Sequence, residues 1–557
     1  MDHQDAFTTE TAGLSEASSP SLVRLYDGDS FDIRIHPVRK RIEDAVVRML
    51  GYNGSIPGPT LHVDQGSEVT VRVTNDGDVD ATVHWHGLRL ENRYDGVPEE
   101  TQALIPHGGT FTYKLRFPDA GIYWYHPHVR EDVAQEMGLY APIVVEPSDP
   151  SYWPAADRQL TITLDDVLIE DGKLAPFRHS GPTFTAMGRF GNVMLVNGES
   201  RFSAEAAAGE VVRLYLVNTA NTRIFNFALP GARMKLVGGD SGRYEHETFV
   251  EEVLLSPSER AVVDVLFDSP GEVRLEHRTP DQVYDLGAFS VSGSAVGGAA
   301  TTFDELRTDL ELAAERESIE ADLEQAPDKV LSIVASMPLL YGGETQPASS
   351  YACPMHPEVT STSPGTCPKC GMKLVASDAP PTRAPEPHEG HAHGGHDHGE
   401  HPRGAHDHGD HGDGLEWEDL MPEINRATDP TNMIWKLVDR ETGAENAAIS
   451  WAFEVGEKVK IRLINEMESD HPMHHPFHVH GAGRFLILGR DGKPESNLVW
   501  KDTVLLRAGE TVDILLYVTN PGLWMAHCHI AEHIESGMMF SFEVAPTSEG
   551  GGDHEHH

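Results

Sequence analysis

The sequence predicts an all-β protein of three Greek-key β-sandwich domains, with a small insertion in the third domain. Two internal repeats predict this fold. The first is a turn glycine followed by alternating apolar residues and a final asparagine, at 66–75, 209–218 and 456–465. Such alternation is typical of a half-buried strand. The second repeat follows each copy of the first and has a turn glycine before its last strand, at 109–128, 258–278 and 509–529. Three copies in the same order therefore indicate three sandwiches.

The spacing of the repeats locates the insertion. The first two copies begin 143 residues apart, at Gly66 and Gly209, whereas the last two begin 247 apart, at Gly209 and Gly456. The additional residues fall where the strand pattern gives way to Pro, Gly, Ser and His. We therefore predict a disordered N-terminus (1–25), domain 1 (26–150), domain 2 (151–297), the start of domain 3 with a linker (298–341), a metal-binding insert (342–380), a disordered His-rich segment (381–414), the rest of domain 3 (415–546) and a tail (547–557).

The composition excludes several classes of protein. A formal net charge of −45 argues against nucleic-acid binding and suits cationic partners, metal ions included. Solubility or a salty habitat is the alternative explanation of this charge. No run approaches the roughly 18 apolar residues of a membrane helix, and the polar N-terminus lacks a signal-peptide core. Three of the four cysteines lie in one short segment, so a disulfide framework is not expected.

Pairs of histidines separated by one residue occur four times. On a strand, the two side chains of such a pair lie on one face, about 7 Å apart. Eight imidazoles are enough for a cluster of three metal ions that share bound oxygen. The domain 2 repeat has Glu276 and Arg278 at the matching positions, so we expect no metal ligands there and a spacing role for that domain. The pairs are His84 and His86, His126 and His128, His478 and His480, and His527 and His529.

The segment from His527 to Met538 carries a second kind of site. If it begins as a strand, Cys528 points away from the face that carries His527 and His529. With His533 and Met538, Cys528 then supplies a thiolate, an imidazole and a weak thioether, which lacks only one histidine of a blue-copper site. One thiolate would thus join two metal sites through a few covalent bonds.

These motifs resemble the signature of the multicopper oxidases, the family of laccases and bacterial copper-resistance oxidases. The resemblance covers about 45–295 and 415–545. It implies three cupredoxin domains and four copper ions that reduce O2 to water: one type 1, one type 2 and two type 3. By motif position it implies that type 1 copper binds His475, Cys528, His533 and Met538. It implies type 2 copper on His84 and His478, and the type 3 pair on His86, His126, His128, His480, His527 and His529.

Two carboxylates resemble the acids that supply protons in this family. Asp95 matches the carboxylate near the trinuclear cluster, and Glu532 matches the proton-relay acid. The alternatives are that Asp95 is a turn residue before Gly96 and that Glu532 is a solvated surface acid. His471 and His474 belong to a neighbouring loop, which we expect near the site entrance, with substrate metal as a candidate ligand.

The insert pairs a C-x-x-H with a C-x-x-C motif, and it resembles the heavy-metal-binding domain of copper and silver efflux proteins. Four such side chains suit a tetrahedral metal ion, so we expect an extra Cu(I) or Zn ion there. Nine histidines between 388 and 411 follow, and their composition indicates a disordered, weak metal-binding arm. The predicted ligands are Cys353, His356, Cys367 and Cys370.

The sequence therefore predicts a copper-dependent oxidase with O2 as acceptor and leaves its reducing substrate open. Cu(I) or another metal ion is one candidate, and a small phenol, as for a laccase, is another. A copper-sequestering resistance protein with secondary oxidase activity is the third. A copper donor protein is a candidate partner, and three complete domains in one chain are compatible with a monomer. Because the family is mostly exported, the resemblance implies a periplasmic or secreted location.

Overall fold

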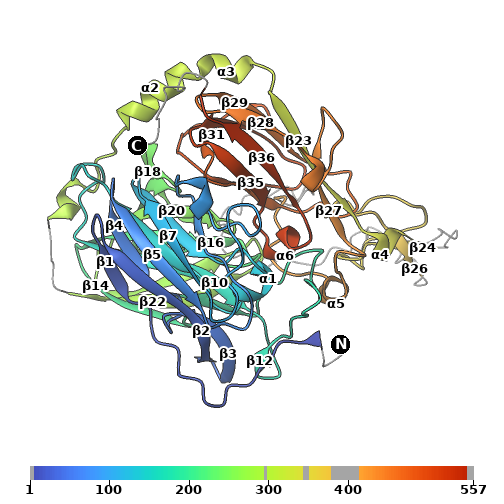
Figure 1. The fold of residues 1–557 in the computed structure, drawn as a ribbon, viewed down its shortest axis with the longest axis horizontal. Coiled ribbons are helices and arrows are strands. Elements are labelled where there is room, and N and C mark those ends of the chain that lie inside the picture. Colours follow the sequence, from blue (N-terminus) through green and yellow to red (C-terminus); the bar gives the residue numbers. More distant parts are fainter. Residues whose placement is uncertain (1–4, 294–297, 343–349, 378–412, 548–557) are drawn as a thin grey trace, which may run out of the picture.

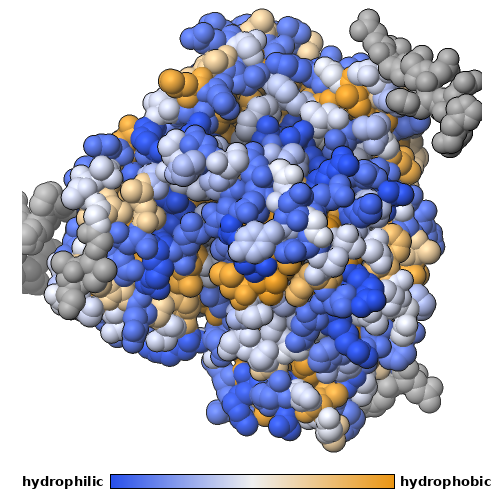
Figure 2. All heavy atoms as spheres, turned by 60° about the vertical axis from the view of Figure 1, so that its left-hand side comes forward, coloured by the Kyte–Doolittle hydropathy of each residue, from blue (hydrophilic) through white to orange (hydrophobic). Residues whose placement is uncertain are grey.

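The computed structural model describes residues 5–293, 298–342, 350–377 and 413–547. Its regular secondary structure consists mostly of strands, with a few short helices (Figure 1). None of the helices among these residues has the length and apolar character needed to cross a membrane. The face in Figure 2 is mostly hydrophilic, with scattered small hydrophobic patches.

The first sandwich, drawn in blue in Figure 1, carries half of the histidine pairs. The two sheets enclose a core that includes Trp85, Tyr113 and Tyr125. One sheet has the order β3 (Ala45–Tyr52), β2 (Ser30–Ile42), β5 (Glu68–Asn75) and β7 (Thr110–Arg116). The other has the order β1 (Leu22–Leu25), β4 (Thr60–Asp64), β9 (Ala141–Glu146), β8 (Gly121–His126) and β6 (His84–His86).

The second sandwich has a separate core around Phe227, Val263 and Phe289. Its six-stranded sheet has the order β13 (Val193–Val196), β10 (Arg158–Val167), β15 (Val211–Asn218), β20 (Arg260–Leu266), β17 (Arg233–Gly239) and β18 (Gly242–Val250). Its five-stranded sheet has the order β14 (Phe202–Ala207), β22 (Val283–Ser292), β21 (Gly271–Arg278), β16 (Phe225–Ala228) and β19 (Glu252–Leu255). The two-stranded pair β11 (Ile169–Glu170) and β12 (Lys173–Leu174) packs on the core of domain 1, to which Leu174 belongs.

The third sandwich repeats this arrangement, and its strand β23 precedes the insert in the chain. Its six-stranded sheet has the order β27 (Ile434–Asp439), β23 (Lys329–Ser336), β29 (Lys458–Asn465), β34 (Thr511–Val518), β31 (Gly483–Arg490) and β32 (Lys493–Pro494). Its five-stranded sheet has the order β28 (Ala452–Glu454), β36 (Met539–Ala545), β35 (Gly522–Cys528), β30 (His475–Val479) and β33 (Thr503–Leu506).

The glycine before the last strand of each repeat has a backbone reason. Gly121, Gly271 and Gly522 open the equivalent strands β8, β21 and β35 with φ of 152°, 143° and 143°. Side chains other than glycine's disfavour such positive φ. The same conformation in all three copies explains why the sequence repeat retains a glycine there.

Short helices join and cap the sandwiches. Helices α2 (Leu310–Ser318) and α3 (Glu320–Glu324) connect domain 2 to domain 3, and the Asp309 side chain caps α2 by accepting from Glu311 N and Leu312 N. Helix α6 (Ala531–Ile534) of domain 3 meets α1 (Glu131–Ala134) of domain 1, where the backbone N–H of Glu131 donates to Glu535 Oε1 at 2.9 Å. The other helices of the described residues are α4 (Pro338–Tyr341) and α5 (Pro422–Arg426), with 3-10 turns at Asn92–Tyr94, Ala299–Thr302 and Asn446–Ala448.

The N-terminal segment differs from the prediction that 1–25 is disordered. The hydroxyl of Ser180 donates to Asp5 Oδ2 at 2.7 Å, and the ring of Phe7 lies 3.8 Å from that of His179. Residues 5–25 are therefore placed against the folded domains. Polar composition suggested disorder because these contacts to distant residues leave no pattern in the segment itself.

The insert forms a small three-stranded sheet in the order β25 (Thr360–Ser361), β24 (Ser350–Ala352) and β26 (Val375–Ser377). Four of its buried side chains belong to the same hydrophobic cluster as Cys528 of domain 3: Cys353, Met355, Cys367 and Met372. The insert thus packs on the domain. The predicted His-rich segment lies outside the described residues up to position 412, and so does the tail from 548.

Candidate metal centres

The four histidine pairs converge between domains 1 and 3. In domain 1, β6 pairs with β8 so that His84 faces His126, and in domain 3, β30 pairs with β35 so that His478 faces His527. Across the interface, the rings of His86 and His478 stack 3.8 Å apart. All eight imidazoles are at most 5% exposed.

Domains 1 and 3 thus both contribute to two groups of three histidines. His128, His480 and His527 place ligand nitrogens within 4.8 Å of one another, with 3.0 Å between the Nε2 atoms of His480 and His527. In the other group, the His529 ring lies 4.9 Å from that of His86 and 5.2 Å from that of His126. His84 and His478 lie between the groups, with ring centroids 5.8 Å apart.

The protein holds most of these rings through Nδ1 and leaves Nε2 free. Backbone carbonyls accept from Nδ1 of His84, His126, His478 and His527 at 2.7–2.9 Å. The Asp95 carboxylate contacts His480 Nδ1 at 2.7 Å. Five of the buried Nε2 atoms lack a protein partner, those of His84, His86, His126, His478 and His529. A buried nitrogen without a partner is destabilising, and metal ions in this space would satisfy all five.

Electrostatics also favours metal binding. Burial, followed by repulsion from neighbouring imidazoles, holds the pKa of His86, His126 and His478 well below 6.5, and burial lowers the pKa of His527 to about 3. These four rings are therefore neutral at physiological pH, which is the form that binds metals.

Domain 2 reaches this cluster through one ion pair that the sequence did not reveal. Arg260, at the start of β20, is fully buried and donates to both oxygens of Asp502 at 2.6 and 2.5 Å. Asp502 Oδ1 in turn lies 3.4 Å from His86 Nδ1 and 3.6 Å from His478 Nδ1. Domain 2 thus fixes the carboxylate that faces two of the histidines.

The thiolate site lies on the opposite face of β35. Cys528 Sγ is 3.4 Å from His475 Nδ1 and 3.6 Å from His533 Nδ1, and all three residues are buried. Met538 is also buried, and its carbonyl accepts from the Cys528 N–H at 3.2 Å. Burial raises the pKa of the Cys528 thiol, so the thiolate form requires a cation beside it. Cys528 and the two imidazole nitrogens, with Met538 in the same buried cluster, supply the residue types of a blue-copper centre: a thiolate, two imidazoles and a thioether.

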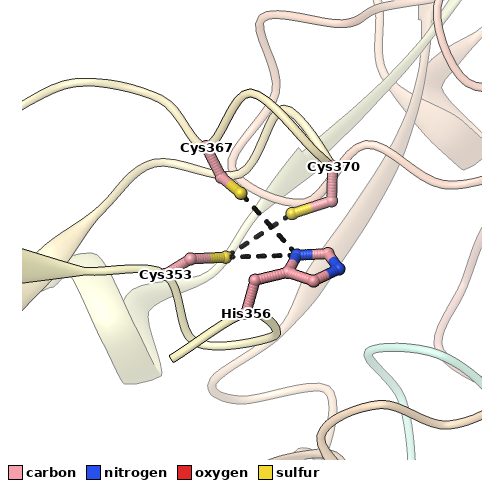
Figure 3. A group of neighbouring side chains, drawn as sticks. All are labelled: Cys353, His356, Cys367 and Cys370. Carbon is pink, nitrogen blue, oxygen red and sulfur yellow. Dashed lines mark hydrogen bonds between the residues drawn. The ribbon is translucent and has the colours of Figure 1, made fainter. Parts of the chain in front are cut away.

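The insert brings its four predicted ligands together (Figure 3). Cys353 Sγ is 3.5 Å from Cys370 Sγ and 3.8 Å from His356 Nδ1, while Cys367 Sγ is 3.6 Å from the same nitrogen. The contact with Cys370 lowers the pKa of Cys353 to about 5. Two zinc-knuckle-like turns therefore face one another with a donor set that suits Zn or Cu(I).

Glu532 and Asp95 are both about 1% exposed. The interpretation of Glu532 as a solvated surface acid is therefore wrong. Its carboxylate accepts from Asn221 Nδ2 at 3.4 Å and Thr222 Oγ1 at 3.3 Å, and burial together with Asp132 raises its pKa to about 8. Asp95 contacts histidines through both its carbonyl and its carboxylate, which is more than a turn role requires.

The side chains of His471 and His474 are both fully buried. His474 Nδ1 accepts from the backbone N–H of Glu416 at 3.1 Å, and His471 Nδ1 lies against Met372 of the insert. The Nε2 atoms of both rings lack a protein partner.

Comparison with known proteins agrees with this geometry. Family models described as multicopper oxidase match residues 35–150 and 421–548, and a heavy metal binding domain matches 350–376. The chain is 25% identical to multicopper oxidase MmcO of Mycobacterium tuberculosis over 95% of its own length and 90% of that protein. It is 25% identical to copper resistance protein A of Pseudomonas syringae pv. tomato over 46% of this chain and 48% of that one.

Solved structures show the same fold. A multicopper oxidase from Campylobacter jejuni, described as a metallo-oxidase, aligns over 97% of this chain and 99% of that one at 19% identity, with a TM-score of 0.63. A multicopper oxidase from Pseudomonas thermotolerans aligns over 94% and 100% at 24% identity, with a TM-score of 0.61. The chain belongs to the multicopper oxidase family, copper oxidoreductases that reduce O2, and it carries a heavy metal binding domain as an insert.

Proposed function

We propose that this protein oxidises a soft metal ion, Cu(I) foremost, and couples that oxidation to the reduction of O2 to water. The observation that carries the proposal is the position of the insert. Its cysteine–histidine cluster packs into the same buried core as the Cys528 site, so the captured metal and the site of electron entry belong to one packed unit.

We assign the copper ligands from the geometry above. The type 1 ion would bind His475, Cys528, His533 and Met538, and the type 2 ion His84 and His478. The type 3 ions would bind the two groups of three, His86, His126 and His529, and His128, His480 and His527. When bound, the copper ions supply one-electron oxidation at the type 1 site and four-electron reduction of O2 at the other three.

The chain's own residues provide the connections between these sites. Cys528 is flanked by His527 and His529, so a few covalent bonds separate the thiolate from both type 3 groups. Glu532 follows this segment and carries a raised pKa of about 8, which suits it to hold a proton near neutral pH. Asp95 orients the rings of His84 and His480.

A large cavity between the insert and domains 2 and 3 supports a metal substrate. It has a volume of about 1220 Å³, and its lining includes the insert ligands His356, Cys367 and Cys370. Acidic residues also line it, among them Asp281, Asp413, Glu418 and Glu468. An acidic cavity that ends at soft ligands favours the entry of cations. Relatives named for copper resistance and metallo-oxidase activity are consistent with this proposal.

A phenol substrate is the second candidate, because the same cavity also has apolar walls. Leu415, Trp417 and Leu420 line it beside the acidic residues, and an aromatic ring could pack there. Relatives include laccase-1 of Cryptococcus neoformans, 23% identical over 89% of this chain and 77% of that protein.

Steady-state O2 uptake by the copper-loaded protein tests the proposal. Cu(I), Fe(II), Mn(II) and a methoxyphenol would be compared in wild type and in the double variant Cys353→Ser/Cys367→Ser. We expect Cu(I) to have the highest kcat/KM and the double variant to raise its KM, with phenol oxidation unchanged. Glu358→Gln, an exposed change on the insert, is the control. Highest kcat/KM for the phenol would indicate a laccase, and negligible turnover with tight Cu(I) binding would indicate sequestration.

A further inference from the structure

One methionine of the insert reaches a histidine of domain 3 in the protein interior. Met372 Sδ lies 3.2 Å from His471 Nδ1, and both residues have no exposed surface. Met372 follows Cys370 by two residues, so this contact lies directly beneath the cysteine–histidine cluster.

Several contacts fix the insert at this position. Lys373 Nζ forms an ion pair with Asp470 at 2.5 Å, and the Tyr341 hydroxyl donates to the Lys373 carbonyl at 2.8 Å. Gly371 packs so closely that an added Cβ would lie 3.1 Å from Met467 Sδ and from Pro472 Cγ. The turn after Cys370 is therefore pressed against the loop that carries His471, which makes the Met372 contact a defined feature.

The separation of the two atoms matches that of ligands on a shared metal. A thioether or thiolate at about 2.3 Å and an imidazole at about 2.0 Å from a tetrahedral ion lie about 3.5 Å apart. In this structure, the sulfur–nitrogen separations are 3.4 and 3.6 Å at Cys528, and 3.8 and 3.6 Å at the insert cluster. The 3.2 Å between Met372 and His471 lies just below this range.

The state of His471 also suits a metal ligand. Burial lowers its pKa to about 4, so the ring is neutral, and its Nε2 atom has no protein partner. If Nδ1 carries the proton, the ring donates only to a weak thioether acceptor while Nε2 stays unsatisfied. If Nε2 carries it, Nδ1 presents a free lone pair to the space beside Met372.

We propose that Met372 and His471 form a binding site for a soft monovalent cation, Cu(I) or its analogue Ag(I), between the insert cluster and the Cys528 site. A neutral thioether and imidazole select soft ions over Mg²⁺ or Mn²⁺. Two ligands fall short of the four that structural Zn²⁺ requires, which argues against zinc at this site.

The proposed site lies close to the Cys528 site, which suits it to electron transfer. The ring of Trp435 lies 6.0 Å from that of His471, and 4.6 and 4.5 Å from those of His475 and His533. Trp435 is held by a hydrogen bond from Nε1 to the Thr185 carbonyl at 2.7 Å. One indole ring thus separates the proposed site from two ligands of the Cys528 site. We expect a Cu(I) ion at this site to give up its electron to the Cys528 site. This role rests on the proposed function, whereas metal binding at the site does not.

Binding of Ag(I) tests the site without turnover, because Ag(I) is not oxidised by the enzyme. Copper-loaded full-length protein would be equilibrated with Ag(I) by dialysis, and bound silver would be counted per chain. We expect Met372→Leu and His471→Gln each to bind one Ag(I) fewer than wild type. The histidines between 388 and 411 are the same in all variants and cancel in this difference. Leu conserves the volume of Met, and the two variants approach the site from opposite sides.

Met355→Leu is the matched control, because Met355 is another buried methionine of the insert. It should bind as much Ag(I) as wild type. Wild-type binding by Met372→Leu or His471→Gln would overturn the proposal, and so would an equal loss in Met355→Leu. If the wild type oxidised only phenols while both variants still bound one Ag(I) fewer, the proposed function would be refuted but the metal site would be supported.

Discussion

Replacement of Arg260 by Met should weaken both the fold and the histidine cluster. The guanidinium is fully buried and makes five hydrogen bonds: to the two Asp502 oxygens at 2.6 and 2.5 Å, to the Ile122 carbonyl at 3.0 Å, to the Ser258 carbonyl at 3.1 Å and to His86 Nδ1 at 3.5 Å. Met fills much of the same volume but leaves the Asp502 carboxylate buried without its cation. Breaking a buried ion pair in this way costs about 3–5 kcal/mol.

The magnitude predicts a clear shift in urea unfolding of the copper-loaded protein. A loss of about 4 kcal/mol changes the unfolding equilibrium nearly a thousandfold, since each 1.4 kcal/mol is a factor of ten. Asp502 also faces Nδ1 of His86 and His478. The electron paramagnetic resonance signal of type 2 copper should therefore change in the folded variant, because His478 is one of its assigned ligands.

Arg213→Met is the control that separates stability from positioning. Arg213 is also buried in domain 2 and binds both oxygens of Asp264 at 2.8 Å, but Asp264 faces no histidine of the cluster. Its replacement should cost a similar free energy and leave the copper signal unchanged. If Arg260→Met lowered the free energy of unfolding by less than about 1 kcal/mol, the reasoning would be refuted, because breaking a buried ion pair usually costs more. An equal spectral change in both variants would remove Arg260 from the positioning role.

Three further changes test other parts of the account. Cys528→Ser should abolish the blue absorption and the oxidase activity while keeping the fold, and retained turnover of any substrate would contradict the ligand assignment. Glu532→Gln should slow the reoxidation of reduced enzyme by O2 more than it slows type 1 reduction, as measured by stopped flow; equal slowing would exclude it from proton delivery. Burial raises the pKa of Glu136 from 4.5 to about 7, so between these values the folded protein retains a proton that the unfolded chain releases. The free energy of unfolding should therefore fall by up to about 1.4 kcal/mol per pH unit as the pH rises across that window. Glu136→Gln should flatten this slope in urea titrations, and an unchanged slope would contradict the raised pKa.

The sequence predicted the parts of the molecule that repeat along a strand. Because side chains alternate along a strand, Cys528 was predicted on the opposite face of the strand from His527. The register of β30 and β35 agrees, since His527 pairs with His478 and Cys528 pairs with Phe477. The C-x-x-H and C-x-x-C motifs predicted the insert cluster because each pair of ligands lies within one turn. These features depend on local geometry, and local geometry follows from spacing.

Contacts between distant segments could not be predicted in this way. The ion pair of Arg260 and Asp502 joins residues 242 positions apart, and neither residue belongs to a motif. Similarly, His471 was expected near the site entrance, and nothing in its loop indicates that Met372 of the insert packs against it. Both features depend on how the domains and the insert pack together, which no periodicity in the chain records.

The most direct test of the central claim is the anaerobic reaction of the oxidised, copper-loaded protein with one equivalent of Cu(I). Loss of the blue absorption would be followed after rapid mixing, in wild type and in Cys353→Ser/Cys367→Ser. Cu(I) should bleach the band faster than a methoxyphenol does, and the double variant should slow only the Cu(I) reaction. Faster bleaching by the phenol, or an unchanged Cu(I) rate in the variant, would contradict this claim.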